Sequence, residues 1–156
     1  MTAPPIPDLF AADALAPARA HLGALPQLTP TSAVLNLDPA PTAPRAARAF
    51  TRAALKRWQL PDLIDDAAKV VSELVTNALV HAERPDPATP ITLRLRRQSD
   101  CLHIEVDDQD PQHLPNFAAT ATDSGGRGLF LVAALAGKTG ASTTATTKTV
   151  WADLAA

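Results

Sequence analysis

The sequence contains no tyrosine, a single cysteine and few aromatic residues, and each shortage excludes a class of protein. Aromatic residues make up 4% of the chain, so stacking on nucleic-acid bases is poorly supported. The lone Cys101 excludes an internal disulfide framework and a multi-cysteine zinc ribbon. The formal net charge of −2 provides no basic excess for non-specific binding to phosphates. We therefore expect no direct binding to nucleic acid.

Long apolar runs are also missing. The longest strongly apolar run, residues 129–136, is far too short to span a bilayer. No basic residue precedes Arg19, which argues against a secretory signal. A chain of 156 residues, of which 46% are hydrophobic and 19% charged, is long enough to bury one core. We expect a soluble, cytoplasmic protein without membrane attachment.

Proline divides the chain into two parts. Nine of the 15 prolines lie in residues 1–44, where a long regular element cannot form. We interpret residues 1–30 as a flexible or loosely docked arm, which is either a plain tail or a binding segment. Residues 31–156 are then the folded domain.

Hydrophobic periodicity in the remaining chain predicts a mixture of helices and strands. A period of 3.6 residues predicts helices at 45–59, 62–82 and 129–136. Alternating apolar and polar residues predict strands at 32–37, 91–96, 102–106 and 149–154. The expected fold class is α+β: a two-layer α/β sandwich, with a mixed, mostly antiparallel sheet and helices on one face.

Three polar residues follow one edge of the second predicted helix. Glu73, Asn77 and His81 are spaced i, i+4 and i+8, so they form a ridge beside the apolar face. Carboxylate and carboxamide oxygens are hard ligands that suit Mg²⁺. The ridge is either part of a binding groove or a solvated stripe, and the spacing alone leaves both interpretations open.

Asp108 follows a strand whose inward residues are apolar. If the strand continues in register, Asp108 lies on the buried face, where a carboxylate needs donors or a pocket mouth. There it could accept a hydrogen bond from an exocyclic amine of a ligand. If the strand ends at Asp107, Asp108 instead faces water in a turn.

Glycines surround Arg127 at the start of the third predicted helix. Gly125, Gly126 and Gly128 would let the backbone approach an anion closely, and Arg127 could donate to a phosphate. A simple turn explains the same residues. The chain has neither GxxxxGK[ST] nor GxGxxG, which excludes a P-loop and a Rossmann fingerprint.

The order of these motifs resembles the GHKL-type ATPase superfamily, which includes histidine kinases and gyrase B. Residues 73–82 resemble its N box, and residues 104–108 its adenine-binding box. Residues 126–132 resemble the second glycine box, and residues 148–154 the final strand. The sequence is most similar to the small anti-sigma-factor serine/threonine kinases of actinomycetes. The resemblance covers residues 32–154 and implies a Bergerat-type ATP-binding fold with ATP and Mg²⁺ as cofactors.

The resemblance also implies a role for each matched residue. Asn77 would coordinate Mg²⁺, Glu73 would act as the general base, and Asp108 would accept a hydrogen bond from the adenine amino group. Residues 109–124 would form a lid over the nucleotide. The further cofactor-binding residues that the resemblance implies are His81, Gly126, Arg127, Gly128, Leu129 and Thr149.

The implied function is a partner switch that controls transcription. Such a kinase phosphorylates a small antagonist protein of the STAS type, alternately binds a sigma factor, and forms a homodimer. One departure bears on catalysis: no lysine or arginine occurs between Arg97 and Arg127, so the lid has no basic residue of its own. Since charge neutralisation is central to phosphoryl transfer, the alternative is a non-catalytic, nucleotide-dependent protein-binding regulator.

Overall fold

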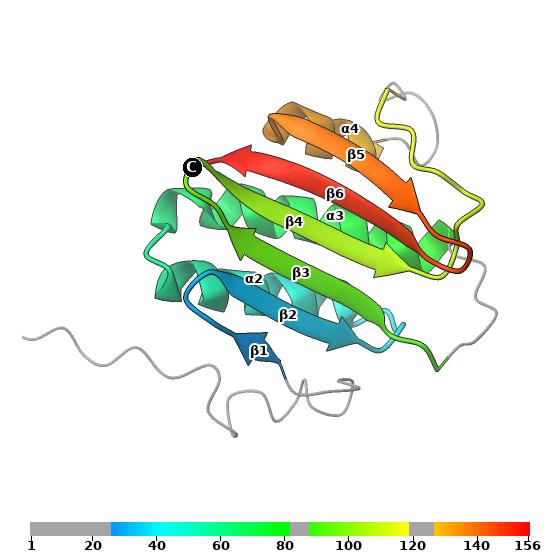
Figure 1. The fold of residues 1–156 in the computed structure, drawn as a ribbon, viewed down its shortest axis with the longest axis horizontal. Coiled ribbons are helices and arrows are strands. Elements are labelled where there is room, and N and C mark those ends of the chain that lie inside the picture. The colour runs from blue at the N-terminus through cyan, green and yellow to red at the C-terminus, as the bar shows by residue number, and fades with distance from the viewer. Residues whose placement is uncertain (1–25, 82–87, 119–126) are drawn as a thin grey trace, which may run out of the picture.

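The computed structural model describes residues 26–81, 88–118 and 127–156, without the side chains of His81 and Arg127. These residues form one six-stranded sheet with strand order β1-β2-β3-β4-β6-β5 (Figure 1). Every neighbouring pair in this sheet is antiparallel. The strands are β1 (Gln27–Leu28), β2 (Ser32–Leu37), β3 (Ile91–Arg97), β4 (Cys101–Asp108), β5 (Lys138–Thr143) and β6 (Lys148–Ala155).

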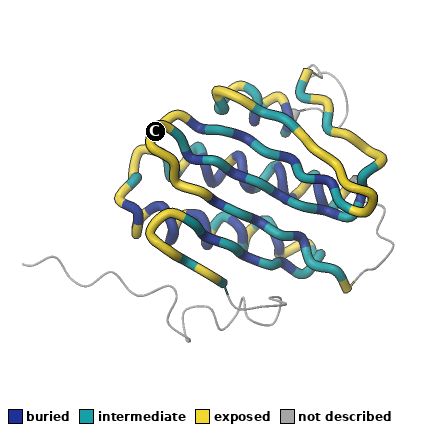
Figure 2. Tube along the Cα trace, viewed as in Figure 1, coloured by how far each residue is buried: buried dark blue, intermediate teal, exposed yellow. Residues whose placement is uncertain are grey.

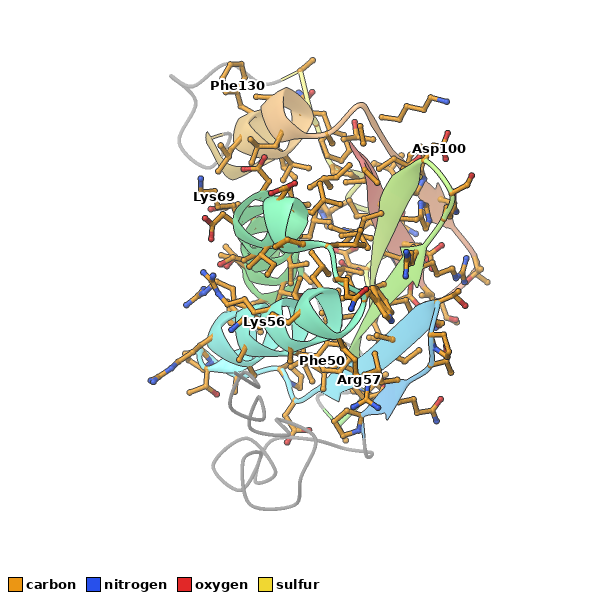
Figure 3. All side chains as sticks on the ribbon, turned by 90° about the vertical axis from the view of Figure 1, so that its left-hand side faces the viewer. Phe50, Lys56, Arg57, Lys69, Asp100 and Phe130 are labelled. Atoms are coloured by element: carbon orange, nitrogen blue, oxygen red, sulfur yellow. The ribbon has the colours of Figure 1, made fainter. Side chains whose placement is uncertain are left out.

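The helices all cover the same face of this sheet. They are α2 (Ala43–Arg57), the short 3₁₀ helix η1 (Pro61–Leu63), α3 (Ile64–His81) and α4 (Arg127–Leu135). Seen from the side, the helices form one layer and the strands the other (Figure 3). The expected α+β sandwich is therefore confirmed.

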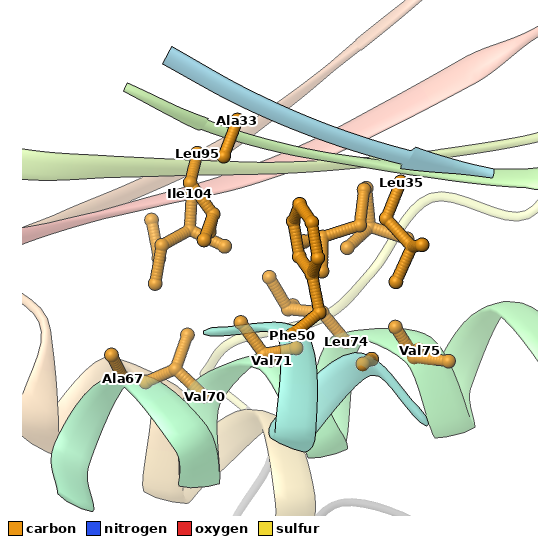
Figure 4. Packing of buried hydrophobic residues seen from close by; sticks show 14 of the residues in the cluster. Ala33, Leu35, Phe50, Ala67, Val70, Val71, Leu74, Val75, Leu95 and Ile104 are labelled. Atoms are coloured by element: carbon orange, nitrogen blue, oxygen red, sulfur yellow. The ribbon is translucent and has the colours of Figure 1, made fainter. Parts of the chain in front are cut away.

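The core fills the space between the two layers. Phe50 of α2 and Leu74 of α3 point toward Leu35 and Ile104 of the sheet (Figure 4), and all four are at most 4% exposed. Buried and half-buried residues alternate along β2, β3, β4 and β6 (Figure 2), as strands with one covered face require. Each large apolar side chain buried in this way contributes about 1.5–3 kcal/mol to folding.

Helix α2 begins and ends where its sequence gives a local signal. It starts at Ala43, which places Pro44 in the first turn, where its missing N–H costs little. It ends at Arg57, two residues before the expected end, and Gln59 then takes a left-handed conformation with φ of 58°. The Trp58 indole N–H donates to the carbonyl of Thr29 at 2.9 Å, which ties α2 to the chain beside β1.

Two strands fall outside the predicted set. β1 pairs with β2 through Gln27 and Leu28, which lie in the segment expected as an arm, whereas residues 1–25 lie outside the described residues. β5 pairs with β6 along its whole length, although its sequence KTGAST shows no hydrophobic alternation. β5 is an edge strand with mostly exposed residues, so no buried face imposed that pattern on it.

The face of the sheet opposite the helices carries a ladder of charged side chains. Arg94 of β3 pairs with Asp107 of β4, and Glu105 lies 3.4 Å from Arg96. His103 contacts Glu105 at 3.0 Å and also pairs with Asp153 of β6. Within the described ranges, no helix has the length and apolar character needed to cross a membrane.

Candidate functional site

Three elements have their ends at one end of the sandwich. α3 and β4 finish there and β6 begins there, on the right-hand side of Figure 1, while α4 begins beside the middle of α3. Antiparallel pairing of β4 with β6 places the end of one strand beside the beginning of the other, with Asp108 opposite Lys148. Most of the residues singled out from the sequence lie on α3, on the first turn of α4 and on the paired ends of β4 and β6.

Glu73 and Asn77 lie on successive turns of α3. Their neighbours Leu74 and Ala78 are buried, at 2% and 1% exposure, whereas Glu73 and Asn77 are themselves half-buried. The helix therefore keeps its core contact while it presents an acid and an amide at the edge of the covered face. The predicted ridge therefore lies at the boundary of the core, with both side chains partly covered.

The carboxylate of Glu73 packs directly against Gly128, in the first turn of α4. A methyl group on Gly128 would overlap Oε2 of Glu73, closer than real Cβ atoms approach, and would lie 3.0 Å from its Cδ. Glycine at this position is therefore what allows α4 to begin beside the Glu73 side chain. The contact joins the N-box acid to the glycine box.

Asp108 continues the inward register of β4 and is 4% exposed. Its Oδ1 accepts a hydrogen bond from the Asp110 N–H at 2.8 Å, and its Oδ2 lies 3.4 Å from Nζ of Lys148. Burial raises the pKa of Asp108 above its ordinary value, while the Asp110 N–H and Lys148 oppose that rise. The alternative, a strand ending at Asp107 with Asp108 in water, is excluded.

The segment after β4 is folded against this end of the sheet. Asp110 is 2% exposed, and its Oδ1 accepts hydrogen bonds from the N–H groups of Gln112 at 3.2 Å and His113 at 3.3 Å. Lys148 Nζ donates to the carbonyl of His113 at 2.6 Å, and Phe117 packs against the core. Residues 109–118 of the expected lid are thus held in place, and residues 119–126 lie outside the described residues.

Thr149 is not brought together with Asp108. The register pairs Thr149 with Asp107, on the face of the sheet opposite the helices. The hydroxyl of Thr149 donates to Oδ1 of Asp107 at 2.6 Å. The residue of β6 that shares the face of Asp108 is Lys148. The expected contact of Thr149 with the nucleotide stays a prediction.

The other predicted residues divide into two groups. Leu129 is 7% exposed and belongs to the hydrophobic core, where it packs α4 against the sheet. Gly126 and the side chains of His81 and Arg127 lie outside the described residues, so their expected contacts with a nucleotide stay predictions. Among the side chains that the structure describes, no cluster of three or more His, Cys, Asp or Glu could hold a metal.

Lys148 and Asp110 are the residues of this end that sequence reasoning missed. Lys148 occupies an inward position of β6, two residues before the buried Val150. Extending the alternation of β6 back by one residue would have placed this cation on the apolar face, although its partner depends on the register of the sheet. Asp110 gave no comparable signal, because it follows the strand in a proline-containing loop.

The residues present fit a magnesium nucleotide. A carboxylate and a carboxamide on adjacent turns are suitable groups to hold Mg²⁺ and to take a proton. Asp108 has two oxygens with about four acceptor positions, of which the described contacts use two, so it can still accept from an amino group. The first N–H groups of a helix such as α4 favour an anion.

This fold and this set of motifs define an ATP-binding sandwich of the GHKL type. The sequence profile of the histidine kinase-like ATPase domain matches residues 37–153, which is more than half of the chain. The chain therefore belongs to the family of histidine kinase-like ATPase domains. A search of curated proteins finds no match to the chain.

Proposed function

We propose that this protein is an ATP- and Mg²⁺-dependent serine/threonine kinase of the anti-sigma-factor type. The observation that carries the proposal is the contact of the Glu73 carboxylate with Gly128, which brings the acid of α3 beside the first turn of α4. An acid, an amide one turn away and a glycine at a helix start are the parts that phosphoryl transfer from a bound nucleotide needs.

Each side chain has a defined task in this proposal. Asn77 holds the Mg²⁺, which neutralises charge on the phosphates when it is bound. Glu73 takes the proton from the attacking hydroxyl group of the partner, because a half-buried carboxylate near the phosphates can act as a general base. Asp108 accepts a hydrogen bond from the adenine amino group.

The proposed substrate is a serine or threonine of a small STAS-type antagonist protein. Phosphorylation places negative charge inside the interface between the two proteins, where desolvation and repulsion favour release. The freed kinase then binds a sigma factor, and we propose that it does so as a homodimer. The resemblance of the N box and glycine box to anti-sigma kinases supports these partners.

A second candidate is a regulator that binds nucleotide without transferring phosphate. It is favoured by the charge of the lid, which has no lysine or arginine between Arg97 and Arg127. Lys148 does not replace such a residue, because its ammonium group is buried and bound to Asp108 and to the carbonyl of His113. Two acids of the expected lid, Asp110 and Asp123, add negative charge instead.

Transfer of γ-labelled phosphate from ATP to a co-purified antagonist tests the two candidates. We expect labelling by the wild-type protein and loss of at least about 100-fold in the rate with Glu73→Gln, within the range that a general base contributes. Glu105→Gln, on the opposite face of the sheet, is the matched control and should keep the rate. ATP binding without labelling by the wild-type protein would establish the non-catalytic regulator.

A further inference from the structure

Lys148 is the largest fully buried side chain of the described residues, with 1% exposure. A buried ammonium group needs partners, because removal of a charge from water is costly. Its Nζ lies 3.4 Å from Oδ2 of Asp108 and donates to the carbonyl of His113 at 2.6 Å. Neither the motifs nor the proposed mechanism gives this lysine a task.

We propose that Lys148 is a positioning residue for nucleotide recognition, which keeps the Asp108 carboxylate ionised and ties residues 110–118 to it. The inference rests on the proposed function, since it concerns the acceptor that we assign to the adenine amino group. It adds that adenine recognition depends on a cation which does not itself touch the base.

The charges around Asp108 show why this cation matters. Desolvation raises the pKa of Asp108, and the Asp110 carboxylate raises it further. The groups that lower it are the Asp110 N–H and Lys148, the cation of β6 that faces the carboxylate. His113 Nδ1 lies 2.7 Å from the Asp110 carboxylate and is a further titratable group among the described residues here. Without Lys148, two buried carboxylates would face each other.

Ionisation decides what Asp108 can offer a ligand. A carboxylate accepts hydrogen bonds at both oxygens, whereas a protonated acid turns one oxygen into a donor. A donor facing an amino group repels it. Lys148 therefore keeps Asp108 a hydrogen-bond acceptor. Its second contact, with the His113 carbonyl, holds residues 110–118 beside Asp108.

The first test needs no nucleotide. Carbon-detected NMR follows the titration of the Asp108 carboxyl group in the wild-type protein, in Lys148→Met and in the matched control Lys138→Met on the exposed edge strand. We expect the Asp108 midpoint to move to higher pH in Lys148→Met alone, with faster amide exchange at Gln112 and His113. An unchanged midpoint in Lys148→Met would overturn the proposal.

The second test measures ADP affinity against pH by calorimetry. In Lys148→Met we expect affinity to fall as pH decreases, by up to about tenfold per pH unit below the Asp108 midpoint, because one proton must leave for binding. The wild-type protein and Lys148→Arg, which keeps the cation, should show a flatter profile over the same range. An identical profile in Lys148→Met and wild type would contradict the proposal.

The double variant Lys148→Met with Asp108→Asn separates positioning from general structural support. It also guards against poor folding of Lys148→Met, because it leaves no unpaired buried carboxylate at position 108. Once Asp108 cannot ionise, removal of Lys148 should cause no further loss of ADP affinity. An equal loss in both backgrounds would assign Lys148 a structural role only. If the wild-type protein binds no ADP, the proposed function fails, whereas the NMR titration still decides the role of Lys148.

Discussion

Asp108 and Glu73, the two acids of the candidate site, lie in different surroundings. Asp108 is 4% exposed and bound to Lys148 and the Asp110 N–H, whereas Glu73 is half-buried against a glycine. A buried carboxylate that is held in place and still has acceptor positions to offer suits recognition, while a carboxylate at the edge of the core can exchange a proton with a substrate. In the proposed function, Asp108 is therefore the acid that binds and Glu73 the acid that reacts.

The raised pKa of Asp108 predicts how its contribution to stability depends on pH. The native state holds the Asp108 proton more tightly than the unfolded chain does. The contribution of Asp108 to the unfolding free energy therefore falls as the pH rises from 3.8, the ordinary pKa of this group, to its raised pKa in the native state. Within that pH window, the unfolding free energy of the wild type minus that of Asp108→Asn should decrease by at most about 1.4 kcal/mol per pH unit. Urea unfolding at several pH values measures it, and a difference that increases with pH would refute the prediction.

The contact between Gly128 and Glu73 predicts a separation of stability from activity. In Gly128→Ala the added methyl group displaces the end of the Glu73 side chain, which is flexible and can swing away at little cost. We expect the midpoint of thermal unfolding to change by only a few degrees, while phosphate transfer falls as far as in Glu73→Gln.

Gly137→Ala is the matched control for this substitution. A methyl group there meets only the Asp153 carbonyl at 3.8 Å, an ordinary contact, so both stability and transfer should be kept. Full activity in Gly128→Ala would show that the position of the Glu73 carboxylate is unimportant for the reaction.

At the scale of elements, β5 depends on one close approach to β6. The indole of Trp151 lies over Gly140, where a methyl group would come 2.7 Å from Cε2 and 2.9 Å from Nε1 of the ring. The ring also lies beside His103, with centroids 5.8 Å apart, so it has little freedom to move. β5 is thereby held flat against β6.

Gly140→Ala should therefore destabilise the protein, unlike Gly137→Ala, which lies directly before β5. We expect a loss of about 1–3 kcal/mol, typical of an overpacked site, measured by urea unfolding at neutral pH. Equal stability of the two alanine variants would show that the Trp151 ring adjusts freely.

The elements that the sequence predicted well are those with one buried face. The apolar period of α3 placed Glu73 and Asn77 correctly on one ridge, and the alternation of β4 placed Asp108 inward. β5 was missed because an exposed edge strand has no such period. Thr149 was assigned by motif alone, and the register of β6, which pairs it with Asp107, was not predicted.

The pairing of Lys148 with Asp108 does not follow from the order of the motifs. It depends on which residues stand opposite each other in the β4–β6 pair, which is a property of the folded sheet. The arrangement of residues 110–118 depends in turn on Asp110 and His113, since loop geometry follows side-chain contacts that have no period.

At the scale of the whole molecule, the two faces of the sheet differ, because the helices cover only one of them. The helix-covered face holds the core and, at one end, the residues assigned to the nucleotide. The opposite face carries the ladder from Arg94 to Asp153, which is satisfied within the sheet. Substrate chemistry is therefore assigned to one end of the sandwich and not to the open face.

The central claim is that Asn77, Glu73 and Asp108 serve one magnesium–nucleotide site at this end. Asn77 is half-buried at the edge of α3, so Asn77→Ala should leave the fold intact, which circular dichroism checks. The most direct measurement is calorimetric titration of ATP with and without Mg²⁺, on the wild-type protein and on Asn77→Ala. We predict that Mg²⁺ strengthens ATP binding to the wild type and has no such effect on the variant; equal ATP affinity of both proteins in the presence of Mg²⁺ would contradict the account.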